Sequence, residues 1–295
     1  LALVLASTRV GLLPLPVPLL VPMPELAFFD IAIDKWQLYL HSSRHGISCP
    51  RTWMHDLTSG NKGEYELPLV VKPTTGFGGG MGIALLTTGK DWEKYFSLRR
   101  SGHLAYLLQE YIEGVDYSCS VLCEKGRILA HTIQKSLSAQ EGSFGPQMVY
   151  RFEKNRKILD VCTALMKSLN WSGIASVDIR YDQQADTYKI LEINTRFWRS
   201  LVGSLYAGVN FPHLLVQLSM EGHLKGQDFF KDIYFYDLKG YFQAVRRNPL
   251  LALNPGVMKR NTPLGLMLID PSPYIYKFIW RTRNVIRSKI KKSAH

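Results

Sequence analysis

Three polar side chains alternate with apolar or small residues in the segment KILEINTRFW (189–198). They are Glu192, Asn194 and Arg196. In a β-strand, residues i, i+2 and i+4 project from one face, so a carboxylate, an amide and a guanidinium would point together while the residues between them enter the core. A solvated strand face produces the same alternation, and this segment alone does not separate the two interpretations.

The segment before it predicts a partner strand. GIASVDIRYD (173–182) is rich in Ile and Val. The polar segment DQQAD (182–186) that follows is typical of a turn. A hairpin centred on this turn places Asp178 opposite Glu192, and Ser176 opposite Asn194. Like charges that face each other across two strands destabilise the sheet, so the pair needs a cation. Because Mg²⁺ prefers carboxylate and carbonyl oxygens together with substrate phosphates, we predict a magnesium site at Asp178, Glu192 and Asn194.

A glycine-rich loop is a candidate phosphate site. LPLVVKPTTGFGGGMGIALL (67–86) predicts two strands on either side of this loop. Glycines let backbone N–H groups approach an anion closely, and Lys72 at the end of the first strand would direct a cation toward it. Neither a GK[ST] sequence nor a GxGxxG context is present, so the loop is not a Walker or Rossmann motif. We interpret it as a phosphate cradle, with a flexible hairpin tip as the alternative.

A predicted hinge follows in AYLLQEYIEGVDYSCSVLCEKGRILA (105–130). An apolar strand breaks at Glu113 and Gly114, and an antiparallel pair of strands then turns at 124–126. A strand that stops and re-enters another sheet predicts a hinge between two subdomains. Exposed backbone groups of residues 110–112 could pair with an adenine edge and Asp116 could accept ribose hydrogen bonds, while a structural role is the competing interpretation.

The composition is that of a globular protein. The chain has 295 residues, of which 46% are hydrophobic, so it can bury one large core or two moderate ones. Its four cysteines form no CxxC pair or His cluster, and we interpret them as reduced thiols of a cytoplasmic protein. Five prolines between Pro14 and Pro24 argue against a membrane-spanning helix at the N-terminus. We expect residues 1–25 to be an extended connector or the remnant of a preceding domain. The chain begins with Leu rather than Met, and we expect it to be a fragment or a processed form.

The formal charge of +12 is unevenly distributed along the chain. Residues 276–295 carry seven Lys and Arg residues and no acid, with aromatic and aliphatic residues between them. This pattern is typical of a basic amphipathic helix at an anionic membrane surface or on nucleic acid. A solvated helix whose apolar side packs on its own domain is the alternative. Because the charge is confined to one tail and no nucleic-acid-binding fold is evident, we expect no specific nucleic-acid partner.

The order and spacing of these segments resemble the ATP-grasp superfamily, which includes D-alanine:D-alanine ligase, biotin carboxylase and carbamoyl phosphate synthetase. The resemblance covers residues 26–222. It implies an α+β fold in which a small lid and a larger subdomain with an antiparallel sheet clasp ATP. Family members usually have a complete α/β domain before the segment that resembles AIDK, and we expect most of that domain to be absent here. The domain boundaries expected on this basis are 1–25 connector, 26–66 linking helices, 67–112 lid, 113–222 metal and substrate subdomain, and 223–295 C-terminal extension.

The resemblance also implies roles for individual residues. Phosphate contacts fall on Lys35 of AIDKWQLY, on Lys72, and on the loop glycines Gly78, Gly79, Gly80 and Gly82. The adenine hinge corresponds to Gln109, Glu110, Tyr111 and Ile112, the ribose acid to Asp116, and the magnesium ligands to Asp178, Glu192 and Asn194. Arg196 corresponds to the Arg of the family's ENPR motif, which faces the transferred phosphate or the acceptor. Two departures are Thr195, where Pro is usual, and Met81, where a basic residue is common.

The acceptor site is less clearly encoded. The segment from 131 to 154 follows the hinge strands and is expected to line the substrate side. Within it, Lys135 is the preferred carboxylate-binding residue over Arg151 and His131, and surface charges on a loop are the alternative.

The implied activity is that of an ATP-dependent ligase. Such an enzyme activates a carboxylate as an acylphosphate and joins it to an amine, or less often a thiol, with release of ADP and phosphate. The expected cofactors are ATP and two Mg²⁺ ions, for which Mn²⁺ can substitute. The expected partners are small carboxylates and amines, an anionic membrane surface through residues 276–295, and a second copy of the chain. A nucleotide-binding module without ligase activity, acting as a scaffold or regulator, is the alternative function.

Overall fold

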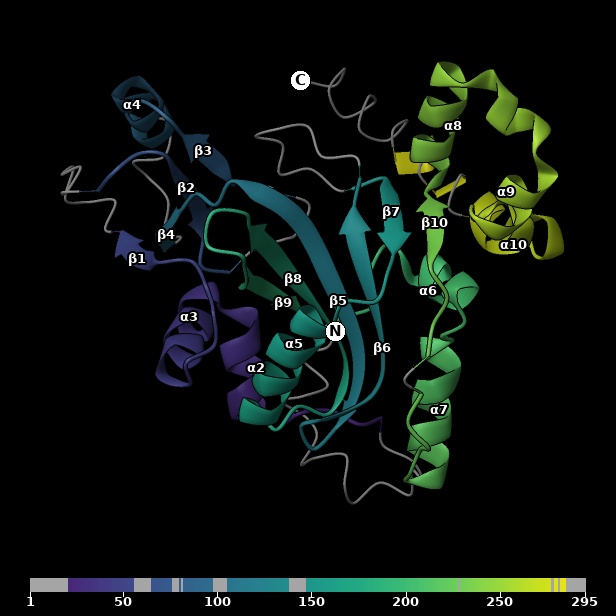
Figure 1. Ribbon diagram of the computed structural model, residues 1–295, viewed down its shortest axis with the longest axis horizontal. Coiled ribbons are helices and arrows are strands. Elements are labelled where there is room, and N and C mark those ends of the chain that lie inside the picture. The colour runs from purple at the N-terminus through teal and green to yellow at the C-terminus, as the bar shows by residue number, and fades with distance from the viewer. Residues whose placement is uncertain are drawn as a thin grey trace.

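The computed structural model describes residues 21–55, 65–75, 80, 82–97, 105–137, 147–227, 229–276, 279–280 and 282–284. Within these residues the chain forms two antiparallel sheets, each covered by helices, and a group of short helices near its C-terminal end (Figure 1). This arrangement confirms the predicted α+β class. No helix in the described part of the chain is long and apolar enough to cross a membrane.

The small sheet has four strands in the order β1-β4-β2-β3. Their bounds are β1 Thr52–His55, β2 Leu69–Pro73, β3 Ala84–Leu86 and β4 Tyr106–Glu110. β2 is the apolar run LVVKP and is buried along its length, as expected for a central strand. One face of the sheet packs against α4 (Gly89–Ser97), where Trp92 and Tyr95 join Leu69, Val71 and Leu108 in a separate small core.

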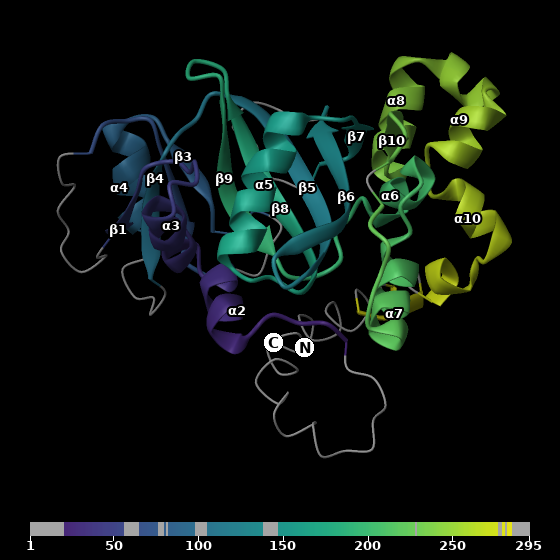
Figure 2. The same ribbon diagram turned by 60° about the horizontal axis from the view of Figure 1, so that its bottom comes forward.

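The larger sheet has six strands in the order β10-β7-β6-β5-β8-β9. Their bounds are β5 Gly114–Glu124, β6 Arg127–Ser136, β7 Val149–Phe152, β8 Gly173–Asp182, β9 Thr187–Asn194 and β10 Ile233–Tyr236. β4 ends at the predicted hinge, and the chain enters β5 of the other sheet four residues later. The two sheets therefore meet at the hinge, as Figure 2 shows from a second direction.

Helix α5 (Arg156–Ser168) covers one face of the larger sheet. It begins where the Asn155 side chain accepts a hydrogen bond from the Ile158 N–H at 3.1 Å. Its buried residues recur at helical spacing and join strand residues such as Val177 in the main core. Since neighbouring strand residues point to opposite faces, the polar residues that alternate with this core lie on the face away from α5.

The β8–β9 hairpin has the predicted register. Asp178 pairs with Glu192 and Ser176 pairs with Asn194, and the turn between the strands lies within 183–186. An irregularity after Asp178 shifts the register by one residue, so that Ile179 pairs with Ile190. Such a bulge keeps the polar row on one face above and below the irregularity.

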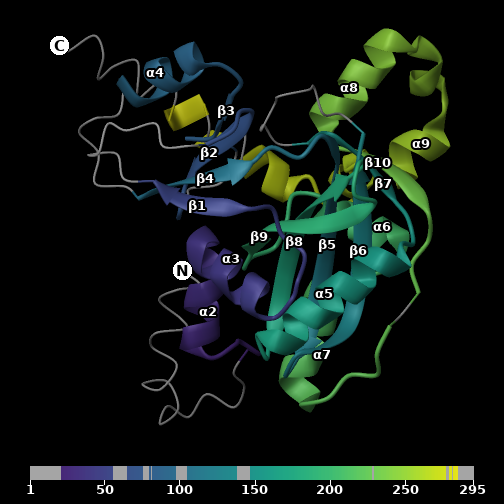
Figure 3. The ribbon, with the colours of Figure 1, turned by 60° about the vertical axis from the view of Figure 1, so that its left-hand side comes forward.

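The remaining helices connect the sheets or extend the chain beyond them. They are α2 (Leu26–Ile33), α3 (Lys35–Arg44), α6 (Leu201–Ala207), α7 (Phe211–Glu221), α8 (Leu238–Arg247), the 3-10 helix η1 (Pro249–Leu253), α9 (Pro255–Arg260) and α10 (Leu264–Ile269). The segment 26–66, expected as linking helices, contributes α2 and α3 beside β9 (Figure 3) and also the edge strand β1 of the small sheet. The predicted helix at 276–295 falls mostly outside the described residues.

Candidate active site between the two sheets

Two carboxylates meet on the polar face of the larger sheet. Asp178 on β8 and Glu192 on β9 are directly opposite each other and within hydrogen-bonding reach. The Asn194 side chain donates to Asp178 Oδ2 at 2.9 Å and to Glu192 Oε1 at 3.4 Å. Arg196 follows on the same row, and its Nη2 donates to Asn194 Oδ1 at 3.2 Å. The structure thus brings Asp178 together with the three residues that the alternating segment singled out.

Two lysines from other elements point toward these carboxylates. Lys35 Nζ lies 3.2 Å from Glu192 Oε2. Lys35 is the first residue of α3, and its backbone N–H donates to Thr74 O at 2.9 Å, which fixes the start of the helix next to the end of β2. Lys72 on β2 is only 5% exposed, and its Nζ donates to Gln109 Oε1 at 2.8 Å. Both predicted phosphate-binding lysines therefore lie beside the predicted metal ligands.

Burial and charge shift the pKa values of these groups strongly. Burial raises the pKa of Asp178, and the neighbouring charge of Glu192 raises it further. Burial also raises the pKa of Glu192, but Lys35 and then Lys72 outweigh it and hold that pKa below its ordinary value. Burial lowers the pKa of Lys72 to about 8, against the opposing effect of Glu192. Without a cation, the protein therefore favours one negative charge on the carboxylate pair rather than two.

The donor set fits a hard divalent cation. No cluster of three or more His, Cys, Asp or Glu side chains suited to a metal occurs in the described part of the chain. A cation here would therefore take the two carboxylates and would complete its shell with phosphate oxygens and water. The Asn194 amide oxygen, which accepts from Arg196 here, would join them after the side-chain amide turns over. This is the usual arrangement for Mg²⁺ in nucleotide-binding sites.

Ser118 on β5 is a site residue that the sequence did not reveal. It pairs with Asp178 in the register of β5 and β8, and its Oγ donates to Asp178 Oδ1 at 2.8 Å. This bond fixes the carboxylate from the side opposite Asn194. The signal that could have identified Ser118 is the alternation of polar and apolar residues in DYSCS, once β5 is placed beside β8.

The predicted adenine hinge lies where the two sheets meet. The Gln109 side chain turns inward to hold Lys72, and its Nε2 donates to Thr52 Oγ1 at 3.0 Å. The Glu110 N–H donates to Arg51 O, and Ile112 O accepts from Arg180 Nε, both at 2.9 Å. Two backbone groups that we expected to be exposed are therefore already bonded within the protein.

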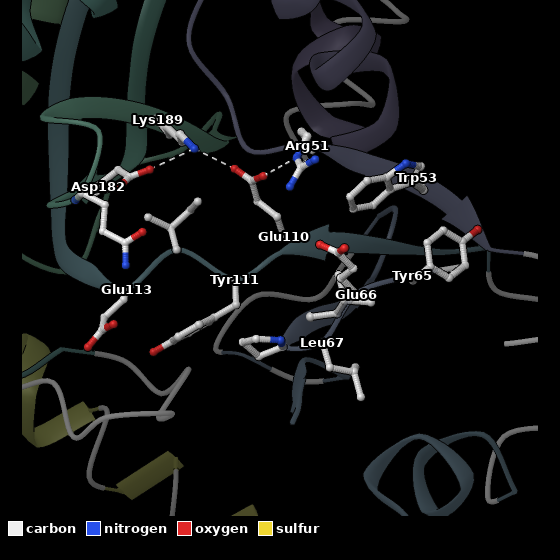
Figure 4. A pocket seen from close by; sticks show the side chains of 14 residues that line it. Arg51, Trp53, Tyr65, Glu66, Leu67, Glu110, Tyr111, Glu113, Asp182 and Lys189 are labelled. Atoms are coloured by element: carbon white, nitrogen blue, oxygen red, sulfur yellow. Dashed lines mark hydrogen bonds and ion pairs between the residues drawn. The ribbon is translucent and has the colours of Figure 1, made fainter. Parts of the chain in front are cut away.

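The Glu110 carboxylate joins the two sheets at the hinge. It accepts from Arg51 Nε at 2.7 Å and from Lys189 Nζ at 2.6 Å, and Lys189 also pairs with Asp182 at 3.0 Å. Figure 4 shows this row of charges along one side of a cavity of about 920 Å³, with Tyr111 on another side. Because Arg51 precedes β1 while Lys189 lies on β9, Glu110 links the small sheet to the larger one.

Asp116, the predicted ribose acid, lies on the same face of the larger sheet as Ser118 and Asp178. Its Oδ1 accepts from Arg180 Nη1 at 2.6 Å. The Arg180 guanidinium also lies 5.9 Å from the centre of the Tyr111 ring. Asp116 therefore lies between the hinge and the carboxylate pair. One of its oxygens is already in an ion pair with Arg180.

The glycine-rich loop is described only in part. Gly78 and Gly79 lie outside the described residues. Gly80 and Gly82 have positive φ angles of 77° and 78°, a conformation that residues with a side chain rarely adopt. The loop ends beside α4, where the Tyr95 hydroxyl donates to Gly82 O at 2.7 Å.

Lys135, the predicted acceptor-binding residue, is not brought to this cluster. It pairs with Tyr117 across β5 and β6, and its Nζ lies 5.8 Å from the centre of the Tyr117 ring, on the α5 side of the sheet. The neighbouring Gln134 pairs with Ser118 instead and so shares the face of Asp178. The sequence does not determine which face of the sheet each residue of β6 occupies. In the structure, strand alternation turns Lys135 away from Asp178 and Glu192.

Other residues that were not predicted lie farther along the polar face, on β6 and β7 and after β9. Ser136 is opposite Tyr150, and its buried hydroxyl has no hydrogen-bond partner among the described residues. Burial raises the pKa of Tyr150. The charge of Arg199 lowers this pKa in part, and the charge of Asp178 raises it. Arg199 is held by Asp237, to which it donates from both Nε and Nη2.

Comparisons with known proteins agree with the family resemblance noted in the sequence. Residues 32–200, which include every predicted site residue, match the ATP-grasp domain. The chain is 22% identical over 219 residues to the D-aspartate ligase of Enterococcus faecium (strain Aus0004), a match that covers 66% of this chain and 52% of that protein.

Solved structures share the fold. The L-amino acid ligase from Bacillus licheniformis matches with a TM-score of 0.56 and 18% identity over 67% of this chain and 50% of that chain. The biotin carboxylase domain of Hydrogenobacter thermophilus 2-oxoglutarate carboxylase, in complex with MgADP, ADP and bicarbonate, matches with a TM-score of 0.57 and 17% identity over 72% and 51%. The chain spans about half the length of the relatives it matches. By its sequence match and its fold, this chain belongs to the ATP-grasp family.

Proposed function

We propose that this chain binds Mg-ATP between its two sheets and activates a carboxylate for ligation to an amine. The observation that supports this proposal most strongly is the convergence of Asp178, Glu192 and Asn194 with Lys35 and Lys72. These five side chains come from four separate elements. Such a cluster supplies cations for phosphate oxygens and oxygen ligands for a divalent cation in one place.

The nucleotide would lie along the polar face of the larger sheet. We place the phosphates near Lys35 and Lys72, under the loop that contains Gly80 and Gly82. The adenine would lie against the hinge, where it uses the backbone groups of 109–112 that the protein does not bond itself. Asp116 would then accept from ribose hydroxyls through the oxygen that Arg180 leaves free.

The metal ligands we propose are Asp178, Glu192 and the Asn194 amide oxygen, with two Mg²⁺ ions as the expected number and Mn²⁺ as a substitute. When bound, magnesium would neutralise the charge on the phosphates and align them for transfer. Ser118 orients Asp178, and Lys35 orients Glu192, so the carboxylates are held in position before the cation arrives.

The proposed reaction has two steps. An oxygen of the substrate carboxylate attacks the γ-phosphorus as the bond to the ADP oxygen breaks, which gives an acylphosphate and ADP. The amine nitrogen then attacks the acyl carbon, the bond to the phosphate oxygen breaks, and the amine loses a proton as phosphate departs. Arg196, held by Asn194 next to the carboxylate pair, would stabilise the charge that develops on the departing phosphate.

We propose that the activated acid is an amino acid. Two of the matched relatives are a D-aspartate ligase and an L-amino acid ligase, which supports this class of substrate. On the acceptor side of the polar face, Arg199 could bind a carboxylate of the substrate, and the Ser136 hydroxyl could bond a second polar group. Lys135 could take this role only after a rearrangement of β6, so we assign acceptor binding to Arg199 and Ser136 instead.

Measurement of ADP release tests this proposal. The full chain would be incubated with Mg-ATP and a panel of D-aspartate and the L-amino acids, singly and in pairs. We expect ADP release that requires both Mg²⁺ and an amino acid, and that falls about a hundredfold in Glu192→Gln. The matched control is Asp186→Asn in the turn of the same hairpin, which pairs with Lys157 on the surface and should keep full activity. Binding of Mg-ATP without ADP release for any pair would contradict ligase activity and favour a nucleotide-binding module.

A further inference from the structure

The C-terminal part of the chain forms a separate surface at one end of the molecule. α8, η1, α9 and α10 follow β10 and pack mainly on one another, as Figures 1 and 2 show. We call the surface of residues 238–276 the C-terminal platform. η1, α9 and α10 contain no buried residue, and α8 buries only Gly240 and Tyr241. These elements therefore contribute little to the core of the domain.

Large apolar side chains are unusually exposed on and just after the platform. Half of the 18 exposed large apolar residues in the described chain lie between 242 and 280. The most exposed are Ile269 at 81% and Leu253 at 76%. The nine residues are Phe242, Leu250, Leu253, Leu268, Ile269, Ile275, Tyr276, Ile279 and Trp280. So many exposed apolar side chains in one segment are typical of a surface that a membrane or another molecule covers.

The same region holds nearly all of the net charge of the protein. Residues 238–295 contain 12 Lys and Arg residues and one acid, Asp270, which gives a charge of +11 of the total +12. Five of these cations are on the platform, namely Lys239, Arg246, Arg247, Lys259 and Arg260. None of the five forms an ion pair with a described residue. Their charge is therefore available to an external anionic partner.

We propose that the C-terminal platform docks on the surface of an anionic lipid bilayer. Exposed apolar side chains interleaved with basic ones, on short helices with almost no acid, suit the boundary between lipid headgroups and acyl chains. A second copy of this chain would present the same positive surface and be repelled. Nucleic acid would match the charge but would leave Leu250, Leu253 and Ile269 without an apolar partner.

The platform is connected directly to the candidate active site. The Asp237 carboxylate caps α8 by accepting from the Gly240 N–H at 2.7 Å. It also binds Arg199, which follows β9 in the chain. A Cβ atom built on Gly240 would lie 2.4 Å from Met148 O, so α8 packs closely against the residues that enter β7. A docked platform would thus hold the acceptor side of the site near the bilayer.

Sedimentation of the full chain with vesicles tests this proposal. We expect the protein to sediment with vesicles of phosphatidylcholine containing a third phosphatidylserine, and not with pure phosphatidylcholine. Arg246→Gln/Arg247→Gln should weaken binding to the anionic vesicles about thirtyfold, since each basic residue near such a surface contributes roughly a fivefold factor. Leu253→Asp/Ile269→Asp should abolish it, because both apolar anchors are lost.

The matched control is Val216→Asp/Met220→Asp on α7, which is outside the C-terminal platform and lies below α8 and α9 in Figure 3. These residues are 56% and 63% exposed, and the control variant should sediment like the wild type. Each variant is checked for an unchanged thermal midpoint. Failure of the wild type to sediment would overturn the proposal. So would full sedimentation of the platform variants, or a dimer in analytical ultracentrifugation that Leu253→Asp/Ile269→Asp dissociates.

Vesicle binding is read out without nucleotide, so this test is independent of the ligase proposal. A variant that neutralises Arg287, Lys289, Lys291 and Lys292 separates the tail from the platform. We expect it to bind more weakly but to remain sensitive to the loss of Leu253 and Ile269. If the tail variant alone abolishes sedimentation, the platform is not the docking surface.

Discussion

At the scale of single residues, Lys72 is the most perturbed cation of the candidate site. Burial lowers its pKa to about 8 from an ordinary value of 10.5. The folded protein therefore binds this proton less tightly than the unfolded chain does, so stability should rise as the pH increases from 8 toward 10.5. Between pH 7.5 and 9.5 this linkage amounts to about 2 kcal/mol.

Urea denaturation of the wild type and of Lys72→Met at these two pH values measures this effect. We expect the free energy of unfolding of the wild type to gain about 2 kcal/mol relative to the variant at the higher pH. Mg-ATP should bind the wild type more weakly there, because neutral Lys72 no longer attracts phosphate. An equal pH response of the two proteins would show that Lys72 is not a buried cation.

Ser118 supports the metal site through a single hydrogen bond. Replacing it by Ala removes the donor to Asp178 Oδ1 and should weaken Mg²⁺ binding in the presence of ATP about tenfold, as is common when a group that orients a metal ligand is lost. A Mg²⁺ titration of the ATP-dependent rise in thermal midpoint measures this. Ser97→Ala at the end of α4, where the exposed hydroxyl donates only to Lys94 O among the described residues, is the control. Equal Mg²⁺ requirements would assign Ser118 to packing alone.

The residues that could be predicted from the sequence are those positioned by local geometry. Asp178, Glu192 and Asn194 belong to one hairpin, and the length of its turn fixes their register. Ser118 escaped prediction because its contact with Asp178 depends on the pairing of β5 with β8, which are separated by β6, β7 and α5 along the chain. The position of Lys135 on the α5 side of the sheet could not be predicted for the same reason, since nothing local determines the face of β6.

At the scale of elements, the hinge is held by Glu110. Burial raises the pKa of this carboxyl, but hydrogen bonds from Arg51 and Lys189 outweigh burial and hold the pKa below its ordinary value of 4.5. Its contribution to stability is therefore present at neutral pH and is lost as the pH falls below about 4.5. Loss of this contact should loosen the lid sheet from the larger subdomain.

Glu110→Gln should lower the free energy of unfolding at pH 7 by about 2 kcal/mol, because Lys189 keeps only Asp182 as a charged partner. Hydrogen exchange should also become faster in β4 and the hinge. Glu113→Gln is the matched control, since Glu113 is exposed and forms no ion pair with any described residue. Unchanged exchange at 105–112 in Glu110→Gln would mean that packing, rather than this ion pair, fixes the hinge.

Strong local patterns also decided which elements the sequence could predict. The apolar run LVVKP and the β8–β9 hairpin were both recognisable. β1 was missed because TWMH is short and lies at the edge of a sheet, where its partner β4 is more than 50 residues away. Its inclusion in the small sheet depends on a long-range pairing that propensity alone does not encode.

At the scale of the whole molecule, the site lies where two sheets meet at a hinge. The lid contributes Lys72 and Gln109, the larger sheet contributes Asp178 and Glu192, and α3 contributes Lys35. The order of these segments along the chain predicted the family, which the match over residues 32–200 confirms. The exposed C-terminal platform could not be foreseen, because its apolar side chains have the spacing of ordinary short helices and only the structure shows that they remain uncovered.

The central claim is that these elements together form a Mg-ATP site, and the thermal midpoint of the full chain tests it most directly. Mg-ATP at a hundredfold excess over its dissociation constant should stabilise the protein by about 2.7 kcal/mol, which raises the midpoint by several degrees. We predict that this shift requires Mg²⁺, disappears in Glu192→Gln, and persists in Asp186→Asn. A folded wild-type protein whose midpoint does not respond to Mg-ATP, or a shift that Glu192→Gln retains in full, would contradict the account.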